Sequence, residues 1–503
     1  MRVCLINPYV DISGSVYHEG FTMLPPLGLA YLAAVLIEAG HEVKIIDCIS
    51  ACPLPARERP DGVVRLGIDS DDMMAAVREF GPDVVGISSC YTIHAPQAYE
   101  IAARVKSEYS SDAPVILGGA HVSVVPKEAL GQPAVDYVAV GEGEGIITDF
   151  CDALQRGRTP EDIPGLLSLS DDGSLKGIRE RPRIEDLDSI PFPRRDLVPL
   201  DPYLARQRLY PGDINNRRIP KTSVMTSRGC PGNCVFCAVR CTWGRKWIGR
   251  SPANVVDEIE SLVDYYGIRE FDFVDDNVSV SKSRLTGICD LIVERGMDIT
   301  WATPNGIAIW TLDHELLRSM KRAGCYRLTF GFESGDPDTI SFIRKRYSVD
   351  KARDIVKYAN HLGMWTVGTF VLGFPYEDAG NIGNTVDFAC SLGLDLAMFY
   401  CATPYPGTEM FEVCRELGVD TTTTPHTRGF DTANLTAEEV ETLRRGATVR
   451  FMNGLKRHPW KPIEKVHSLD DLRFTAKVTA HGLRMVLSRG EGEKLSRYPN
   501  YER

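Results

Sequence analysis

Arg228-Gly229-Cys230-Pro231-Gly232-Asn233-Cys234-Val235-Phe236-Cys237 is the stretch of this 503-residue chain on which its interpretation depends. Three of the 14 cysteines stand here with the spacing C-x3-C-x2-C, directly after a strand-like run. Three thiolates on one loop can hold three irons of a [4Fe–4S] cube and leave the fourth iron without a cysteine ligand. An open metal position is typical of a reactive centre. We therefore interpret Cys230, Cys234 and Cys237 as ligands of an iron–sulfur cluster.

Zinc is the alternative metal for this loop. Zinc sites usually contain paired C-x2-C units or histidines at short spacing, and neither follows the trio. Cys241 could supply a fourth ligand, but Arg240 and a further turn separate it from the trio, so we expect an ordinary thiol. The other cysteines are scattered, and the N-terminus shows no secretory pattern. We expect them to be thiols rather than disulfides.

From Thr222 onward, strand-like and helix-like runs alternate, and the cysteine loop follows the first strand. The predicted strands are Ser223–Ser227, Glu270–Asp275, Thr300–Pro304, Arg327–Glu333, Thr366–Gly373 and Leu396–Ala402. Helical patterns follow the first five, the clearest at Ala253–Tyr266 and Asp350–Leu362. This alternation predicts a TIM-like barrel with six β/α units rather than eight. Functional residues of such a barrel lie at the carboxyl ends of its strands.

The first 150 residues alternate in the same way. Their predicted strands are Val3–Asn7, Glu42–Asp47, Asp83–Ser88, Pro114–Gly118 and Asp136–Val140. The pattern predicts a doubly wound parallel α/β sheet with a ligand crevice beyond the carboxyl ends of its strands. Residues 157–220 contain nine prolines and an Asp171-Asp172-Gly173 turn, which indicates a linker with at most one small hairpin. We expect an α/β protein divided into 1–156, the linker 157–220, a barrel at 221–415 and a helix-rich region at 416–503.

Composition excludes several classes of protein. Apolar residues make up 43% and charged residues 25%, as in ordinary globular proteins. The net charge of −11 lies in residues 1–150, which hold 9 Lys/Arg against 20 Asp/Glu. The remainder holds 48 of each and forms no basic stripe, so we expect no nucleic-acid binding. The longest uncharged apolar stretch, residues 23–37, is shorter than the about 20 residues of a transmembrane helix. We expect a cytoplasmic protein without a transmembrane segment.

The cysteine loop resembles the signature of the radical S-adenosylmethionine (SAM) superfamily, in which an aromatic residue, here Phe236, precedes the last cysteine. Further motifs occur in the family's order at predicted strand ends: Asp275-Asp276-Asn277, Phe330-Gly331-Phe332-Glu333-Ser334-Gly335, Phe370-Val371-Leu372-Gly373-Phe374-Pro375 and Pro404-Tyr405-Pro406-Gly407-Thr408. The resemblance implies that the open iron binds SAM and that one electron, from a donor such as flavodoxin or ferredoxin, releases a 5′-deoxyadenosyl radical. The SAM contacts that it implies are Phe236, Asp276, Glu333, Ser334, Gly373 and Pro375.

Residues 1–150 resemble the cobalamin-binding domain that precedes the barrel in one large subgroup of that superfamily. The cobalamin contacts that the resemblance implies are Ser88, Ser89, Gly118, Gly119, Gly141, Glu142 and Gly143. The D-x-H-x-x-G loop, whose histidine ligates cobalt in other cobalamin enzymes, is absent, and His94 and His121 stand outside such a motif. Either cobalamin is bound without a protein imidazole, or the cofactor has been lost.

Three functions are compatible with these motifs. The first is a C-methyltransferase that moves a methyl group from SAM, through methylcobalamin, to a carbon radical of a small molecule in natural-product or related biosynthesis. The second is a radical cyclase or rearrangement enzyme without methyl transfer. The third is a non-catalytic iron–sulfur sensor, which would not need the SAM-type motifs. Product mass distinguishes the first two, and no catalytic acid or base stands out in the sequence.

Overall fold

The computed structural model describes residues 1–13, 24–50, 63–209, 216–419, 429–455 and 460–487. The chain divides into two compact units. Unit 1 comprises Met1–Leu209 and Val239–Arg250, and unit 2 comprises Tyr210–Ala238 and Ser251–Arg503. No helix within the described ranges is long and apolar enough to cross a membrane.

Unit 1 is built on a seven-stranded sheet with the strand order β3-β1-β5-β6-β7-β8-β9. Its strands are β1 (Arg2–Asn7), β3 (Glu42–Asp47), β5 (Val84–Ser88), β6 (Val115–Gly118), β7 (Tyr137–Ala139), β8 (Leu166–Leu169) and β9 (Leu175–Gly177). The first five run parallel, and β8 and β9 are antiparallel. Because side chains alternate along a strand, Val3 and Leu5 join one core while Cys4 and Ile6 join another.

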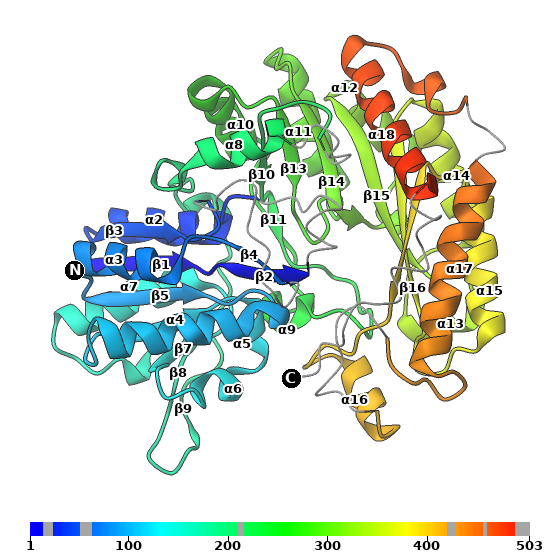
Figure 1. Ribbon diagram of the computed structural model, residues 1–503. Coiled ribbons are helices and arrows are strands. Elements are labelled where there is room, and N and C mark those ends of the chain that lie inside the picture. The colour runs from blue at the N-terminus through cyan, green and yellow to red at the C-terminus, as the bar shows by residue number, and fades with distance from the viewer. Residues whose placement is uncertain (14–23, 51–62, 210–215, 420–428, 456–459, 488–503) are drawn as a thin grey trace. The chain divides into compact units, whose positions relative to one another are not determined.

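Helices lie on both faces of this sheet, which confirms the predicted doubly wound fold (Figure 1). They are α2 (Leu27–Glu38), α3 (Ser70–Phe80), α4 (Ala95–Glu108), α5 (Ala120–Val124), α6 (Pro126–Leu130), α7 (Gly143–Gln155), α8 (Leu200–Leu209) and α9 (Val239–Trp243). The short helices α5 and α6 were not expected, nor was the antiparallel pair of β2 (Val10–Ser13) and β4 (Val63–Leu66).

Most of the predicted linker, residues 157–220, is part of a folded unit rather than a free connection between two domains. Residues 157–209 fold within unit 1, and β8 and β9 extend its sheet on either side of the turn at Asp171-Asp172-Gly173. The reason is apolar burial, because Leu166 and Leu167 of β8 are almost fully enclosed. The β8–β9 pair is the small hairpin that the sequence allowed, but the proline-rich composition did not indicate that this segment packs against the sheet.

Unit 2 contains six parallel strands in sequence order, which confirms the predicted six-unit partial barrel. They are β10 (Lys221–Val224), β13 (Glu270–Phe273), β14 (Thr300–Ile307), β15 (Cys325–Glu333), β16 (Trp365–Leu372) and β17 (Leu396–Cys401). Register shifts interrupt β14 and β15, and β15 ends in one at Glu333. Two-residue strands, β11 (Ser227–Arg228) and β12 (Ile248–Gly249), flank the cysteine loop in sequence.

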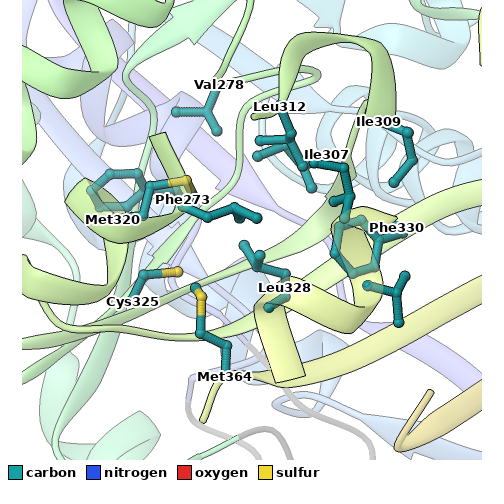
Figure 2. Packing of buried hydrophobic residues seen from close by; sticks show 14 of the residues in the cluster. Phe273, Val278, Ile307, Ile309, Leu312, Met320, Cys325, Leu328, Phe330 and Met364 are labelled. Atoms are coloured by element: carbon teal, nitrogen blue, oxygen red, sulfur yellow. The ribbon is translucent and has the colours of Figure 1, made fainter. Parts of the chain in front are cut away.

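Helices follow the strands of this sheet. The largest core includes residues of α10 (Pro252–Tyr266), α11 (Lys282–Glu294), α12 (His314–Arg322), α14 (Val349–His361) and α15 (Ala379–Ser391). The helices α13 (Pro337–Ile343) and α16 (Glu409–Glu416) instead contribute to a smaller apolar cluster. Figure 2 shows part of the largest core, including Phe273 of β13, Met320 of α12 and Leu328 of β15. The rings of Phe273 and Trp301 stack with centroids 4.5 Å apart.

The C-terminal region is helical, as expected, with α17 (Ala437–Leu455) and α18 (Leu469–Leu487). Thr436 and Glu439 form a capping box at the start of α17, because Glu439 N donates to Thr436 Oγ1 and Thr436 N donates to Glu439 Oε2. Ion pairs from Arg217 and Arg218 to the aspartates at the start of α18 hold that helix on the barrel.

Candidate functional site

The cysteine loop of unit 2 brings the sulfurs of Cys230 and Cys234 to the same glycine. Cys230, Cys234 and Cys237 are free thiols, each partly exposed. A Cβ atom placed on Gly232 would lie 3.3 Å from Cys230 Sγ and 3.9 Å from Cys234 Sγ, so both sulfurs border the space above this glycine. In the described ranges, no three His, Cys, Asp or Glu side chains converge on a single metal ion. In a [4Fe–4S] cube each thiolate binds a different iron.

Two aspartates at the end of β13 fasten this loop. Asp276 Oδ2 accepts a hydrogen bond of 2.9 Å from the backbone nitrogen of Gly229, the residue before Cys230. Asp275 is fully buried and accepts hydrogen bonds from the backbone and hydroxyl of Thr226 and from the hydroxyl of Ser227. Burial raises the pKa of Asp275, although these donors and Arg284 oppose the shift. The aspartates thus connect the predicted D-D-N motif to the cysteine loop.

Glu333 ends β15 in an uncommon backbone conformation. Its φ is 64°, a left-handed value that costs about 1–2 kcal/mol for a residue with a side chain. Its carboxylate pairs with the Lys345 ammonium, with 2.8 Å between Glu333 Oε1 and Lys345 Nζ. The neighbouring Ser334 turns away from this pair, and its hydroxyl lies 2.8 Å from Thr385 Oγ1. Of the neighbouring predicted SAM contacts Glu333 and Ser334, Glu333 therefore lies by Lys345 near the cysteine loop, whereas Ser334 lies by Thr385.

Lys345 is a residue of the site that the sequence did not reveal. Besides Glu333, its ammonium donates to Gly331 O at 3.0 Å and lies 5.8 Å from the centroid of the Phe236 ring. Burial opposes its charge, yet Glu333 and Cys234 outweigh burial and raise the pKa of Lys345 above its usual range. The basic run Arg344-Lys345-Arg346 was visible in the sequence, but it carried no sign that its middle residue turns inward.

The loop after β16 also reaches the cysteine loop. The Phe374 and Phe236 rings lie 5.8 Å apart, and both join a small apolar cluster with Val235 and Met410. Gly373 has a φ of 83°, and a Cβ there would lie 2.5 Å from Val440 Cγ1, so this turn requires glycine. Pro375 accepts a hydrogen bond from Ala433 N.

Glu377 holds the turn between Gly373 and Pro375. Its Oε2 atom accepts hydrogen bonds of 2.7 Å from Gly373 N and 3.0 Å from Phe374 N, and Thr339 Oγ1 donates to its Oε1 at 3.0 Å. Burial raises the pKa of Glu377 to about 7 despite these donors. Sequence analysis did not single out this carboxylate, because its partners are backbone atoms that only the folded turn presents.

Tyr400 lies on the exposed face of β17 next to the same group of loops. Met398 and Tyr400 are 41% and 45% exposed, whereas Phe399 between them is buried, because side chains alternate along a strand. Burial and the nearby Glu333 charge raise the pKa of the Tyr400 hydroxyl. An exposed apolar strip therefore borders the charged part of the site.

In unit 1, the predicted cobalamin contacts lie where β5, β6 and β7 end. Ser89 N donates to Gly118 O at 2.7 Å, which joins the first two ends. Gly119 has a φ of 125°, and a Cβ there would lie 2.6 Å from Ser89 O, so this close approach requires glycine. Gly141 N donates to Ser123 Oγ at 3.0 Å. Parallel strand ends in this order form the crevice of doubly wound domains.

The residues near these strand ends offer both polar and apolar surface. Ser89 Oγ is buried and has no hydrogen-bond partner among the residues described, which is unusual for a buried hydroxyl. Tyr91 and Ile93, on the loop after β5, expose 69% and 53% of their surface. A bound corrin with polar side groups would cover these apolar side chains and offer a partner to the hydroxyl.

Two other predicted cobalamin contacts, Glu142 and Gly143, lie against other parts of the protein. The Glu142 carboxylate pairs with Arg183 at 3.0 Å and accepts a 2.8 Å hydrogen bond from Ile184 N. A Cβ on Gly143 would lie 3.1 Å from Leu32 Cδ2, so this glycine allows α7 to approach α2. A Cβ on Gly118 would lie in ordinary van der Waals contact with Ala139, at 3.8 Å, and Ser88 is partly exposed.

Both histidines of this region have neighbours within the fold. His121 is buried, with Tyr99 Oη 3.2 Å from its Nε2 and Thr92 Oγ1 3.1 Å from its Nδ1. Burial lowers the pKa of His121. The ring of His94 packs edge-on against Tyr91. Both ring nitrogens of His121 thus lie within hydrogen-bond distance of a hydroxyl group.

Comparison with known proteins identifies both domains. The B12 binding domain family matches residues 20–150, and the Radical SAM superfamily matches residues 224–389. An uncharacterized methyltransferase of Pyrococcus horikoshii is 34% identical over 459 residues, covering 90% of this chain and 92% of the relative. The cytidylyl-2-hydroxyethylphosphonate methyltransferase of Streptomyces wedmorensis is 32% identical over 447 residues, covering 83% and 82%.

A solved structure shares the fold. The radical SAM methyltransferase TsrM from Kitasatospora setae, with cobalamin and a [4Fe-4S] cluster bound, superposes with a TM-score of 0.65 at 20% identity, covering 88% of this chain and 81% of TsrM. The two matched families give the present chain its cofactors, which are cobalamin, SAM and the [4Fe–4S] cluster of radical SAM proteins. With both domains matched and two methyltransferases aligned over most of their length, the chain belongs to the cobalamin-dependent radical SAM methyltransferases.

Proposed function

We propose that this enzyme transfers a methyl group from SAM to a carbon atom of a small molecule by radical chemistry. The observation that carries the proposal is a B12 binding domain and a radical SAM domain in one chain, in the arrangement shared with relatives named as methyltransferases. When bound, the cluster and SAM supply a carbon-centred radical, and cobalamin carries the methyl group. The protein's part is to hold these groups and the substrate in position.

Cys230, Cys234 and Cys237 hold the cluster in this proposal. The space that the sulfurs of Cys230 and Cys234 border above Gly232 supports the assignment. Asp276 and Asp275 do not bind the cluster themselves in this proposal. They accept hydrogen bonds that fix the backbone preceding Cys230. Cys241 takes no part, since it lies on α9 and folds with unit 1.

SAM lies against Phe236, Glu333 and the turn from Gly373 to Pro375 in this proposal. Support comes from the contacts that gather these residues, through Lys345 and Phe374, next to the cysteine loop. Ser334 contributes indirectly, because its hydroxyl joins β15 to α15 through Thr385. The left-handed backbone at Glu333 turns its carboxylate back over Gly331.

Cobalamin occupies the crevice at Ser88, Ser89, Gly118, Gly119 and Gly141, without a protein imidazole on cobalt. The unpartnered Ser89 hydroxyl and the close backbone approach at Gly119 support this placement. Glu142 and Gly143 contribute indirectly in this proposal. Glu142 pairs with Arg183, and Gly143 allows α7 to approach α2.

The substrate is a small molecule, and a low-potential carrier such as flavodoxin or ferredoxin supplies the electron. The exposed strip of Met398 and Tyr400 supports a substrate with an apolar part. Apolar surface beside a charged group is common where small ligands bind, because apolar contacts give affinity and a few polar groups give orientation.

Isotope transfer tests the proposal. Holoenzyme is supplied with SAM that carries a deuterated methyl group, a chemical reductant and candidate small molecules, and products are followed by mass spectrometry. Each turnover should yield one S-adenosylhomocysteine, one 5′-deoxyadenosine and one product that carries the label. Substrate-dependent 5′-deoxyadenosine without S-adenosylhomocysteine and without label in the product would instead establish the cyclase or rearrangement alternative.

A further inference from the structure

The ion pair of Lys345 and Glu333 lies beside the cysteine loop, and the proposed function gives Lys345 no role of its own. Lys345 Nζ is 2.8 Å from Glu333 Oε1 and 3.0 Å from Gly331 O, and it faces the Phe236 ring next to Cys237. A lysine side chain loses conformational freedom when it is held in this way, so its position needs a cause in the surrounding fold.

Backbone strain is concentrated around this pair. Among the described residues, the non-glycine positions with positive φ are Glu333, at 64°, and Arg344, at 57°. One carries the carboxylate of the pair and the other immediately precedes the ammonium. Strained backbone of this kind persists where the surrounding structure enforces it, and it is frequent at functional sites.

The left-handed turn at Arg344 directs its two neighbouring side chains in different directions. The turn ends α13, and Lys345 N donates to Ile340 O at 3.2 Å. The exposed Arg344 guanidinium forms two hydrogen bonds with Glu409, while the Lys345 ammonium reaches Glu333 and Gly331. The next basic residue, Arg346, is exposed.

Gly331 keeps space for both charged groups. A Cβ atom at this position would lie 2.9 Å from Glu333 Oε1 and 3.4 Å from Lys345 Nζ. Gly331 does not have a positive φ, so its backbone does not require glycine. The absence of a side chain here serves the pair, which occupies the place that the side chain would fill.

The positive end of the pair lies beside the cysteine loop. Lys345 Nζ is 5.8 Å from the centroid of the Phe236 ring, and Phe236 stands between Cys234 and Cys237 in the sequence. The ammonium interacts electrostatically with both of these thiols. A group bound by these cysteines experiences a fixed positive charge at close range.

We propose that Lys345 raises the reduction potential of the [4Fe–4S] cluster. This inference rests on the proposed function, in which Cys230, Cys234 and Cys237 bind that cluster. Reduction adds one electron from a carrier to the cluster, and no proton or covalent bond changes at Lys345. Because the reduced cluster is more negative by one charge, a nearby ammonium stabilises it more than it stabilises the oxidised cluster. Lys345 is thus a positioning charge that makes the cluster easier to reduce.

A redox titration of the full-length, cluster-loaded protein tests the proposal. Wild type, K345M, K345R and R346M are titrated with dithionite without SAM, and the reduced cluster is followed by electron paramagnetic resonance. At a fixed potential, K345M should show an about tenfold lower ratio of reduced to oxidised cluster, which is 59 mV for a one-electron couple. K345R should stay near wild type because it keeps the charge. R346M is the matched control, since it removes the same charge from the exposed neighbour.

Two further variants separate the lysine from its partner. K345M leaves the Glu333 carboxylate unpaired, so E333Q and the double variant K345M/E333Q complete a cycle. The double variant should still have a lower potential than E333Q. G331A displaces the pair without removing a charge, so it should lower the reduction potential by less than K345M does. If K345M does not fold, G331A tests the proposal in its place. Equal potentials in every cluster-loaded variant would overturn the proposal.

Iron analysis distinguishes this inference from the function on which it rests. Every variant is assayed for iron and sulfide before titration. Full iron content with an unchanged potential contradicts only the role of Lys345. Retention of four irons when Cys230, Cys234 or Cys237 is replaced by alanine would contradict the ligand assignment and hence the proposed function.

Discussion

Glu377 is a single residue whose protonation state should be visible in stability. Its side chain is buried, and burial raises its pKa to about 7, well above the about 4.3 of a free glutamate. The folded protein therefore holds a proton there that the unfolded chain releases between these two values. Stability should fall as pH rises from about 4.5 to 7, by as much as about 3 kcal/mol.

The E377Q variant, which resembles the protonated form, should not show this fall. Unfolding midpoints of E377Q and wild type are compared between pH 5 and pH 8, and their difference should favour E377Q increasingly as pH rises. Asp336, the nearby carboxylate, is retained in both proteins, so it contributes equally. Parallel pH profiles would show that the hydrogen bonds from Gly373 N and Phe374 N keep Glu377 ionised throughout.

At the scale of elements, the cysteine loop and the helix that follows it belong to different parts of the fold. The loop is held by β13 through Asp276, whereas α9, which carries Cys241, packs against α5 in unit 1. Replacing Cys230, Cys234 or Cys237 with alanine should remove the cluster and SAM cleavage. C241A should keep about four irons per chain after anaerobic reconstitution and should still cleave SAM.

C241A is the matched control for the three ligand variants, because it makes the same substitution four residues beyond Cys237. Iron and sulfide analysis and 5′-deoxyadenosine formation with a chemical reductant give two independent readouts. Loss of the cluster from C241A would mean that a fourth thiolate fills the iron that we assign to SAM.

The whole molecule combines two cofactor domains, and the full-length chain should bind one cobalamin for each cluster. In unit 1, both nitrogens of His121 lie within hydrogen-bond distance of hydroxyl groups. We therefore expect the electron paramagnetic resonance spectrum of the Co(II) form to lack superhyperfine splitting from a protein nitrogen. H121A should give the same spectrum as wild type.

An isotope control excludes an unseen nitrogen ligand. Protein labelled with ¹⁵N should give a spectrum identical to the unlabelled protein if no side-chain nitrogen binds cobalt. Splitting that changes with the label, and that disappears in H94A or H121A, would identify a histidine ligand and contradict the absence of one.

The sequence by itself determined where the strands lie along the chain and where the cysteine loop stands among them. All six barrel strands and all five parallel strands of unit 1 overlap the predicted runs, because apolar periodicity is a local property that the chain carries everywhere. The spacing of Cys230, Cys234 and Cys237 is equally local, so the nature of the bound group could be argued from nearby residues.

Tertiary structure alone decided which side chains meet at that loop. Asp276 bonds Gly229 across 47 positions of sequence, and Glu377 bonds the turn at Gly373 only after the chain has folded back. The packing of residues 157–209 on the sheet likewise depends on partners far away in the chain. Lys345 enters the site because a left-handed turn at Arg344 and an unfilled place at Gly331 occur together. Such contacts arise between distant segments, and no local pattern of residue types encodes them.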